Sequence, residues 1–168
     1  MKNKVRKTNA VRMLESAGVP YELRQYSVVG SDLGTGFAVK VAEKVGLPPA
    51  QVFKTLVVRD SDGEIRLACV PSDTELDLKA FAKALGLKKA ELVPVKDVET
   101  VTGYARGSVS PIGTKRSMTV SLDISALDWP VIALSAGVHG LQMLVAPCDL
   151  MRVVRVEHHP IAARVYQR

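Results

Sequence analysis

An apolar, β-branched run occupies residues 52–58, with the sequence Val-Phe-Lys-Thr-Leu-Val-Val. Such a run predicts a strand that is covered on both faces. Side-chain alternation places its one charged residue, Lys54, on the same face as Leu56 and Val58. An ammonium group on an apolar sheet costs free energy unless it reaches water or a partner. Lys54 therefore either reaches solvent from the strand or forms the cationic floor of a pocket for an anion such as phosphate.

Apolar positions at helical spacing predict five helices along the chain. They are expected over residues 8–17, 37–45, 77–85, 95–101 and 147–151. Thr8 and Thr35 are placed to cap the first two helices, and Pro147 can begin the last. A glycine follows each of the first four, as is typical of helix C-termini.

Strand and turn signals complete the prediction of the fold. Asp60-Ser61-Asp62-Gly63 is a strong hairpin signal between strands at 53–59 and 64–71. Further extended segments are expected at 20–26, in a short strand that begins with Lys88-Lys89, and at 119–123, 131–135 and 141–145. Helices mixed with hairpin-linked strands predict an α+β fold rather than a doubly wound one. We expect a single domain over residues 1–168, with a mixed, mostly antiparallel sheet flanked by helices.

Composition narrows the functional classes. The 168 residues are 47% hydrophobic, which is enough for a substantial core, and no apolar stretch is long enough to cross a membrane. Lys and Arg outnumber Asp and Glu by 23 to 17, which favours polyanionic partners. Aromatic residues make up 5%, too few for a base-stacking RNA reader. Cys69 and Cys148 fit neither a disulfide framework nor a metal knuckle, so a cytosolic setting is expected.

Familiar cofactor and metal motifs are missing from the sequence. Gly34-Thr35-Gly36 lacks the third glycine of a dinucleotide-binding loop, and no lysine follows a glycine cluster at P-loop spacing. His158 and His159 could bind a metal together with Glu157 or Cys148. Neighbouring side chains on a strand diverge, however, which favours a surface pair.

Two glycine-rich loops remain, at residues 103–113 and 135–140. If both return toward the lysine strand, their backbone N–H groups could bind an ester carbonyl or a ribose-phosphate. His139, in the second loop, could also act as a general base toward Ser110 or Ser135.

These segments, in this order, resemble the YbaK/EbsC family. The resemblance runs from Lys7 to about Val153 and rests on a string of motifs: Lys54-Thr55-Leu56-Val57, Leu76-Asp77-Leu78-Lys79, Gly103-Tyr104, 107–113 and 135–141. That family is related to the editing domain inserted in bacterial prolyl-tRNA synthetases. Its members are cytoplasmic, stand-alone aminoacyl-tRNA deacylases, best known for removing cysteine from proline tRNA.

The resemblance implies roles for particular residues. Lys54 matches an essential lysine that engages the terminal phosphate or ribose of the tRNA, and Gly107 matches the loop glycine beside the ester. These two are the expected catalytic residues. The expected substrate-binding residues are Tyr26, Phe37, Thr55, Ser108, Ser135, Gly137, Gly140 and Gln142. Gln142 stands where cysteine-editing members often carry Asp, which bears on the amino acid that is accepted.

The expected function is removal of cysteine from mischarged tRNA(Pro) in trans. In this family the substrate thiol is proposed to attack its own ester and form a thiolactone, so no metal or organic cofactor is expected. The expected partners are the acceptor end of the tRNA and prolyl-tRNA synthetase, in the cytoplasm and without a membrane. One alternative is hydrolysis of alanyl- or another small aminoacyl-tRNA by a bound water. Another is a non-catalytic module that binds tRNA or the synthetase.

Overall fold

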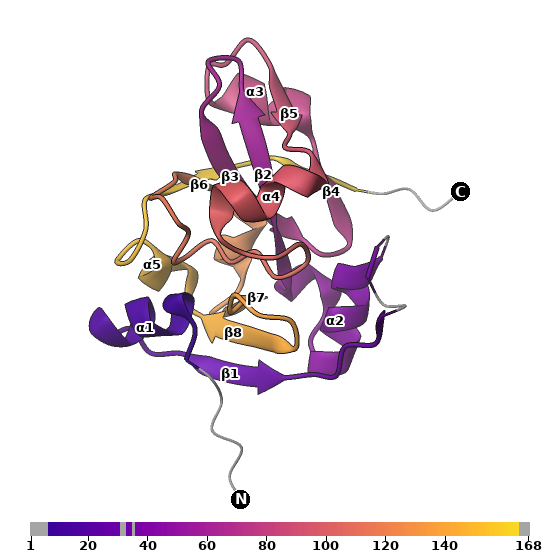
Figure 1. The fold of residues 1–168 in the computed structure, drawn as a ribbon, viewed down its shortest axis with the longest axis vertical. Helices are drawn as coiled ribbons and strands as arrows, with labels where there is room; N and C mark the ends of the chain where they lie inside the picture. The colour runs from indigo at the N-terminus through magenta and orange to yellow at the C-terminus, as the bar shows by residue number, and fades with distance from the viewer. Residues whose placement is uncertain (1–6, 31–32, 35, 165–168) are drawn as a thin grey trace, which may run out of the picture.

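Five α-helices surround the strands in the computed structural model, which describes residues 7–30, 33–34 and 36–164 (Figure 1). They are α1 (Asn9–Ser16), α2 (Phe37–Val45), α3 (Leu78–Ala84), α4 (Val95–Thr102) and α5 (Pro147–Leu150). All five were predicted from the sequence. The Thr8 hydroxyl caps α1 by accepting a hydrogen bond from the backbone N–H of Val11. The other predicted cap, Thr35, lies outside the described residues, and α2 begins directly after Gly36.

Ten strands of the described residues form three sheets rather than the one sheet that was expected. The strands are β1 (Glu22–Gln25), β2 (Phe53–Asp60), β3 (Ile65–Pro71), β4 (Thr74–Leu76), β5 (Ala90–Leu92), β6 (Val120–Asp123), β7 (Ile132–Ser135), β8 (Leu141–Val145), β9 (Val156–His159) and β10 (Ala162–Arg164). The sheet orders are β5-β2-β3-β6-β9, β1-β8-β7 and β10-β4. Among the strand pairs of the described ranges, only β3–β6 and β6–β9 are parallel. The fold is therefore α+β with mixed, mostly antiparallel pairing, as predicted.

Strand β2 is covered on both faces, which confirms the interpretation of its apolar sequence. Phe53 and Val57 belong to the main core cluster. Val58 belongs to a second cluster, on the opposite face, that is built around Phe81 of α3, and Leu56 packs against it. Burial on both sides follows from side-chain alternation and leaves Lys54 on the α3 side of the sheet.

The two larger sheets meet where β2 begins. Val52 forms an isolated parallel bridge with Ala133, at the second residue of β7. The side-chain amide of Gln51 reinforces this junction, because its Nε2 donates to the carbonyl of Val131 at 3.0 Å. In Figure 1 the β2–β3 hairpin rises above β7, β8 and β1, and α4 crosses in front of the strands.

The C-terminal strands were not predicted. One oxygen of the Asp123 carboxylate accepts hydrogen bonds from the backbone N–H groups of Ile161 and Ala162, both at 2.9 Å. These bonds hold the segment that leads into β10. His158 and His159 lie in β9, and each is half-buried rather than on the open surface. No helix in the described part of the chain is both long and apolar enough to cross a membrane.

Candidate functional site

A pocket of about 490 Å³ lies beside the junction of the two larger sheets, which is within the usual size range of small-ligand sites. Six of the predicted site residues line it: Phe37, Lys54, Thr55, Gly107, Ser135 and Gln142. Much of the remaining wall is apolar, with valines from α2, α4, β2 and the 103–113 loop. The fold thus brings together residues that lie far apart in the chain, in a cavity with few polar groups.

Lys54 supplies a cation to the pocket wall. Its side chain is half-buried, and among the described residues it forms neither a hydrogen bond nor a salt bridge. Burial lowers the pKa of Lys54, and the negative charges of Glu75 and Asp73 oppose that shift. A partly dehydrated ammonium without a close partner is suited to bind an anionic group of a ligand.

Gln142 supplies an acceptor without a partner. The residue is only 5% exposed, and its Oε1 accepts no hydrogen bond from any described residue. It lies on β8 directly opposite Ser135 of β7, so both side chains line the pocket from one face of the sheet. A buried acceptor left unpaired costs about 1–3 kcal/mol, which a ligand N–H group can recover.

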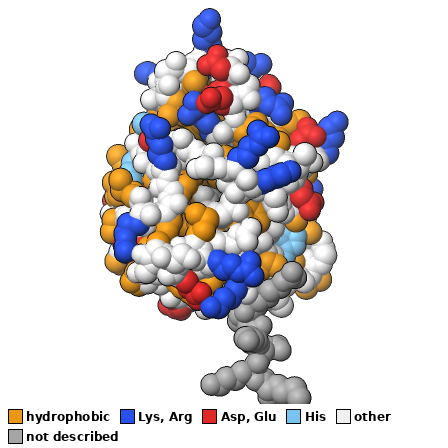
Figure 2. All heavy atoms as spheres, turned by 60° about the vertical axis from the view of Figure 1, so that its left-hand side comes forward, with side chains coloured by type: hydrophobic (Ala, Val, Ile, Leu, Met, Phe, Trp, Pro, Cys, Tyr) orange, Lys and Arg blue, Asp and Glu red, His pale blue; other side chains and the backbone are white. Residues whose placement is uncertain are grey.

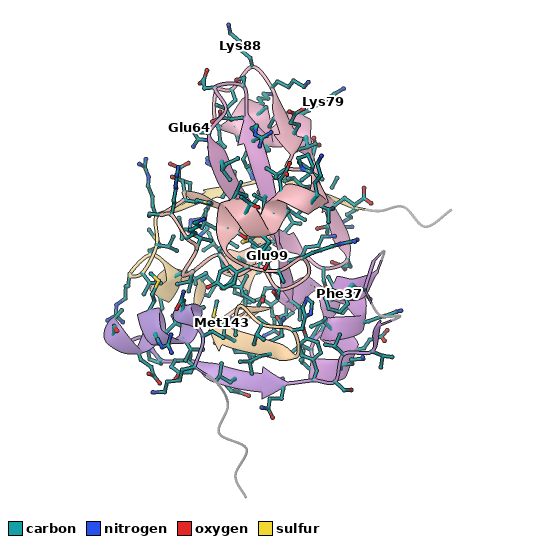
Figure 3. The ribbon with its side chains drawn as sticks, viewed as in Figure 1. Phe37, Glu64, Lys79, Lys88, Glu99 and Met143 are labelled. Carbon is teal, nitrogen blue, oxygen red and sulfur yellow. The ribbon has the colours of Figure 1, made fainter. Side chains whose placement is uncertain are left out.

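Gly107 lies against two aromatic side chains. A Cβ atom at this position would lie 3.2 Å from Nε2 of His139 and 3.4 Å from Cε1 of Phe37. Its φ of +78° also favours glycine. Phe37 begins α2 on the side of the helix that faces the middle of the molecule (Figure 3). Because Gly107 has no side chain, its backbone itself forms part of the pocket wall.

Serine side chains hold the loop that carries Gly107. Ser108 donates from both its backbone N–H and its hydroxyl to the carbonyl of Ala105, at 3.0 and 2.9 Å. The Ser135 hydroxyl donates to the carbonyl of Ser108 at 2.8 Å and accepts from the N–H of Gly137 at 3.1 Å. Ser135 thus lines the pocket and ties the two glycine-rich loops together, whereas Ser108 lies behind the wall.

Three other predicted site residues also lie behind the wall. Tyr26 packs on the cluster beneath α2, and its N–H donates to the carbonyl of Gly140 at 2.9 Å. A Cβ at Gly140 would lie 2.9 Å from the Tyr26 carbonyl oxygen, and a Cβ at Gly137 would collide with the Tyr104 ring. In this structure these residues shape the loops around the pocket and do not line it.

Some pocket residues were missed by sequence reasoning. Ser72, in the β3–β4 turn, and Glu75, in β4, line the wall. Neither was predicted, because β4 is only three residues long. Arg106 also lines the pocket, and its position next to the loop glycine was an available signal. No group of three or more His, Cys, Asp or Glu side chains within the described ranges could hold a metal ion.

The structure does not place His139 as a base for either candidate serine. Its Nε2 lies 2.6 Å from the carbonyl oxygen of Arg106. The Ser135 hydroxyl donates to the carbonyl of Ser108, and the Ser110 hydroxyl accepts from the N–H of Ile112. Each of the three side chains is engaged with backbone instead.

Comparison with known proteins identifies the family. Residues 36–153 match the sequence profile of the aminoacyl-tRNA editing domain. A protein of Enterococcus faecalis, EbsC, named as a candidate Cys-tRNA(Pro)/Cys-tRNA(Cys) deacylase, is 42% identical over 142 residues, which cover 84% of each chain. The chain therefore belongs to the aminoacyl-tRNA editing domain family, and the resemblance to YbaK/EbsC proteins is confirmed.

More distant relatives agree with this assignment. A 76-residue segment is 37% identical to a proline–tRNA ligase of Streptomyces avermitilis, and it spans 45% of this chain and 13% of that enzyme. A crystal structure described as a candidate trans-editing enzyme for prolyl-tRNA synthetase has the same fold, with a TM-score of 0.79. At 22% identity it covers 92% of this chain and 95% of its own.

Proposed function

We propose that this protein is an aminoacyl-tRNA deacylase that removes a wrongly attached amino acid, cysteine first, from tRNA(Pro) in trans. The observation that carries the proposal is one small pocket that contains Lys54, the Oε1 of Gln142 and the exposed backbone of Gly107. Neither Lys54 nor that Oε1 forms a hydrogen bond with a described residue. The pocket occurs in a member of the editing family, and the relative from Enterococcus faecalis supports cysteine as the amino acid.

Each group has a role in this proposal. The ammonium of Lys54 binds the terminal phosphate or ribose of the tRNA, for which a point charge suffices. The Oε1 of Gln142 accepts a hydrogen bond from the α-ammonium group of the aminoacyl moiety. Backbone N–H groups around Gly107 stabilise the negative charge that develops on the ester carbonyl oxygen. Phe37 and the valine side chains exclude water from the ester.

The proposed nucleophile is the thiol of the substrate. Its sulfur forms a bond with the ester carbonyl carbon, the bond from that carbon to the ribose oxygen breaks, and the thiol proton ends on the ribose hydroxyl. The products are a thiolactone and free tRNA. Holding thiol and carbonyl in attack geometry can lower the barrier by about 7–11 kcal/mol at the favourable limit.

A cysteine of the protein is poorly suited to the same task. Cys69 lies on β3 next to the lysine strand, but it is fully buried and does not line the pocket. Burial raises the pKa of its thiol to about 12, although the Thr55 hydroxyl opposes the shift. A buried thiol with a raised pKa is unreactive because the thiolate is the nucleophilic form.

Binding of tRNA is proposed to depend on phosphate contacts. Lys and Arg side chains are spread over the face drawn in Figure 2, with hydrophobic patches between them. With a net charge of +6, the protein should bind tRNA less tightly as salt concentration rises. A flat salt dependence would instead favour a small-molecule substrate. We further propose that the reaction takes place in the cytoplasm, with or without prolyl-tRNA synthetase bound.

The decisive experiment is single-turnover deacylation of a panel of tRNA(Pro) molecules charged with cysteine, alanine or proline. The proposal predicts rapid loss of cysteine, much slower loss of alanine, and a trappable thiolactone. Equal rates for cysteine and alanine would support the alternative in which bound water hydrolyses the ester. Gln142 is consistent with this alternative too, because cysteine-editing members often carry Asp at that position. Ester half-lives that do not change would show a non-catalytic binding module.

A further inference from the structure

The backbone carbonyl of Arg106 is held by His139, a residue that the proposed function does not use. The Nε2 of His139 lies 2.6 Å from that carbonyl oxygen, so the imidazole donates from Nε2 and its Nδ1 carries no proton when the ring is neutral. The ring also packs edge-on against Phe37, with centroids 6.4 Å apart and planes at 70°. The side chain is therefore fixed by both a hydrogen bond and an aromatic contact.

The peptide that His139 holds joins Arg106 to Gly107. No cis peptide bonds occur in the described chain, and in a trans peptide the C=O and N–H groups point in opposite directions. With its carbonyl directed at His139, the peptide directs the Gly107 N–H away from the imidazole. That N–H donates to no acceptor among the described residues. Both Arg106 and Gly107 line the pocket.

A second peptide of the loop, the one that joins Ser108 to Val109, is held from the end of β7. Ser135 donates to the carbonyl of Ser108 at 2.8 Å. The carbonyl groups on both sides of Gly107, those of Arg106 and Ser108, are therefore engaged by side chains of the 135–140 region. Two anchors of this kind restrict rotation of the peptide groups at a glycine that would otherwise turn freely.

We propose that His139 is a positioning residue: by donating to the Arg106 carbonyl, it orients the free Gly107 N–H toward the carbonyl oxygen of the substrate ester. The inference rests on the proposed deacylase function and adds a residue to it. His139 acts through the peptide and does not contact the reacting atoms. Both the neutral ring and the imidazolium donate from Nε2, so the contact persists when the ring is protonated.

Two variants separate the hydrogen bond from the packing of the ring. His139→Phe keeps an aromatic ring against Phe37 but has no donor. His139→Gln has an amide donor that can reach the same carbonyl. Val138→Ala is the matched control, because Val138 lies in the same loop and the residue is 42% exposed.

In single-turnover deacylation of Cys-tRNA(Pro), His139→Phe should reduce the rate constant by about 10- to 100-fold, with little change in the tRNA concentration at half-maximal rate. His139→Gln should restore most of the rate, and Val138→Ala should match wild type. Wild-type rates in His139→Phe would overturn the proposal, and so would equal losses in His139→Phe and His139→Gln.

A second readout does not depend on activity. Selective ¹⁵N-glycine labelling gives amide signals from the 12 glycines, among which Gly107 can be assigned by its loss in a Gly107→Ala sample. The Gly107 signal should move in His139→Phe and stay near its wild-type position in His139→Gln. An unmoved Gly107 signal in His139→Phe would overturn the inference, whether or not the wild-type protein is active. Failure of the wild-type protein to deacylate any tRNA would refute the proposed function alone.

Discussion

The ring of Tyr104 occupies the space next to Gly137 so closely that a Cβ atom at residue 137 would lie 2.6 Å from its Cε1. Tyr104 is buried, and its hydroxyl donates to the carbonyl of Ile112 at 2.7 Å. Burial raises its pKa to about 12, with the backbone of Ala10 opposing the shift. Tyr104, itself part of the 103–113 loop, thus packs against the 135–140 loop on the other side of the contact.

Replacing Gly137 by alanine should destabilise the protein strongly. Its φ of +95° costs an L-residue about 1–2 kcal/mol, and the collision with the Tyr104 ring adds about 1–3 kcal/mol. Gly63→Ala is the matched control, because Gly63 has a φ of +85° but no atom within 4 Å of the position that its Cβ would take. Urea unfolding should show the larger loss for Gly137→Ala. Equal losses would contradict the role assigned to Tyr104.

Replacing Lys54 by alanine should separate activity from stability. Removing a partly buried charge that has no close partner should leave the melting temperature unchanged or raise it. Single-turnover deacylation of Cys-tRNA(Pro) should fall by orders of magnitude. Lys54→Arg should rescue the rate only in part, because a larger planar group enters a close-packed site. A stable Lys54→Ala protein with the wild-type rate would contradict the proposed role.

The control for this charge change is Lys88→Ala, since Lys88 projects from the tip of the molecule (Figure 3).

The pH dependence of stability gives a further check on Lys54. Because the pKa of Lys54 is lowered in the folded state, the unfolded chain binds more protons between that pKa and the ordinary value of 10.5. Lys54 should therefore make stability rise with pH in this window, and Lys54→Ala should remove its contribution.

Two buried glutamines with different surroundings give a prediction for Gln142. Gln142→Leu removes an acceptor that has no partner, so the free energy of unfolding should change little or increase. Gln51→Leu is the matched comparison. It leaves the carbonyl of Val131 unpaired at the sheet junction and should cost about 1–3 kcal/mol. Chemical denaturation of both variants checks the contrast.

Binding of aminoacyl-tRNA should depend on Gln142 even though stability does not. Gln142→Leu should weaken binding of aminoacyl-tRNA relative to uncharged tRNA, because the acceptor for the ammonium group is lost. Gln142→Asp should restore or increase that difference. If charged and uncharged tRNA bind alike to both the wild type and Gln142→Leu, Gln142 does not contact the aminoacyl group.

Asp60 should make the protein sensitive to acid. Burial by itself would raise the pKa of this carboxyl, but hydrogen bonds from the Arg66 side chain and from the N–H groups of Glu64 and Asp62 hold it below its ordinary 3.8. Its stabilising effect is therefore complete above 3.8 and is lost as pH falls through the lowered pKa. Thermal melts from about pH 7 to about pH 2 should show a flatter acid limb in Asp60→Asn. Asp62→Asn, in the same turn but exposed, should behave like wild type.

Helices were predicted well because their signals are local. Thr8 and Asp77 each accept a hydrogen bond from a backbone N–H three residues ahead, and Gly46 and Gly103 end helices with positive φ. The strands β4, β9 and β10 have three or four residues each and depend on distant partners. The sequence around Asp123 does not reveal that its carboxylate binds residues 161 and 162.

The same distinction applies to the pocket. Lys54 could be predicted from the sequence because a single charge in an apolar strand must reach solvent or a ligand. The structure places it in the pocket wall. Gln142 and Ser135 were predicted from a family resemblance, and their pairing follows from the β7–β8 register. The contact of His139 with Arg106 spans 33 positions between two irregular loops. No periodicity of the sequence encodes such a contact.

The junction at the start of β2 determines when during synthesis the pocket can form. The Gln51 side chain meets a carbonyl 80 positions later, and Val52 pairs with Ala133 beyond it. Contacts of such sequence separation form late because a long segment must first be ordered. On the ribosome, the lysine strand therefore emerges long before the β7–β8 wall that encloses it. A growing chain can therefore complete this pocket only after β7 and β8 have also left the ribosome.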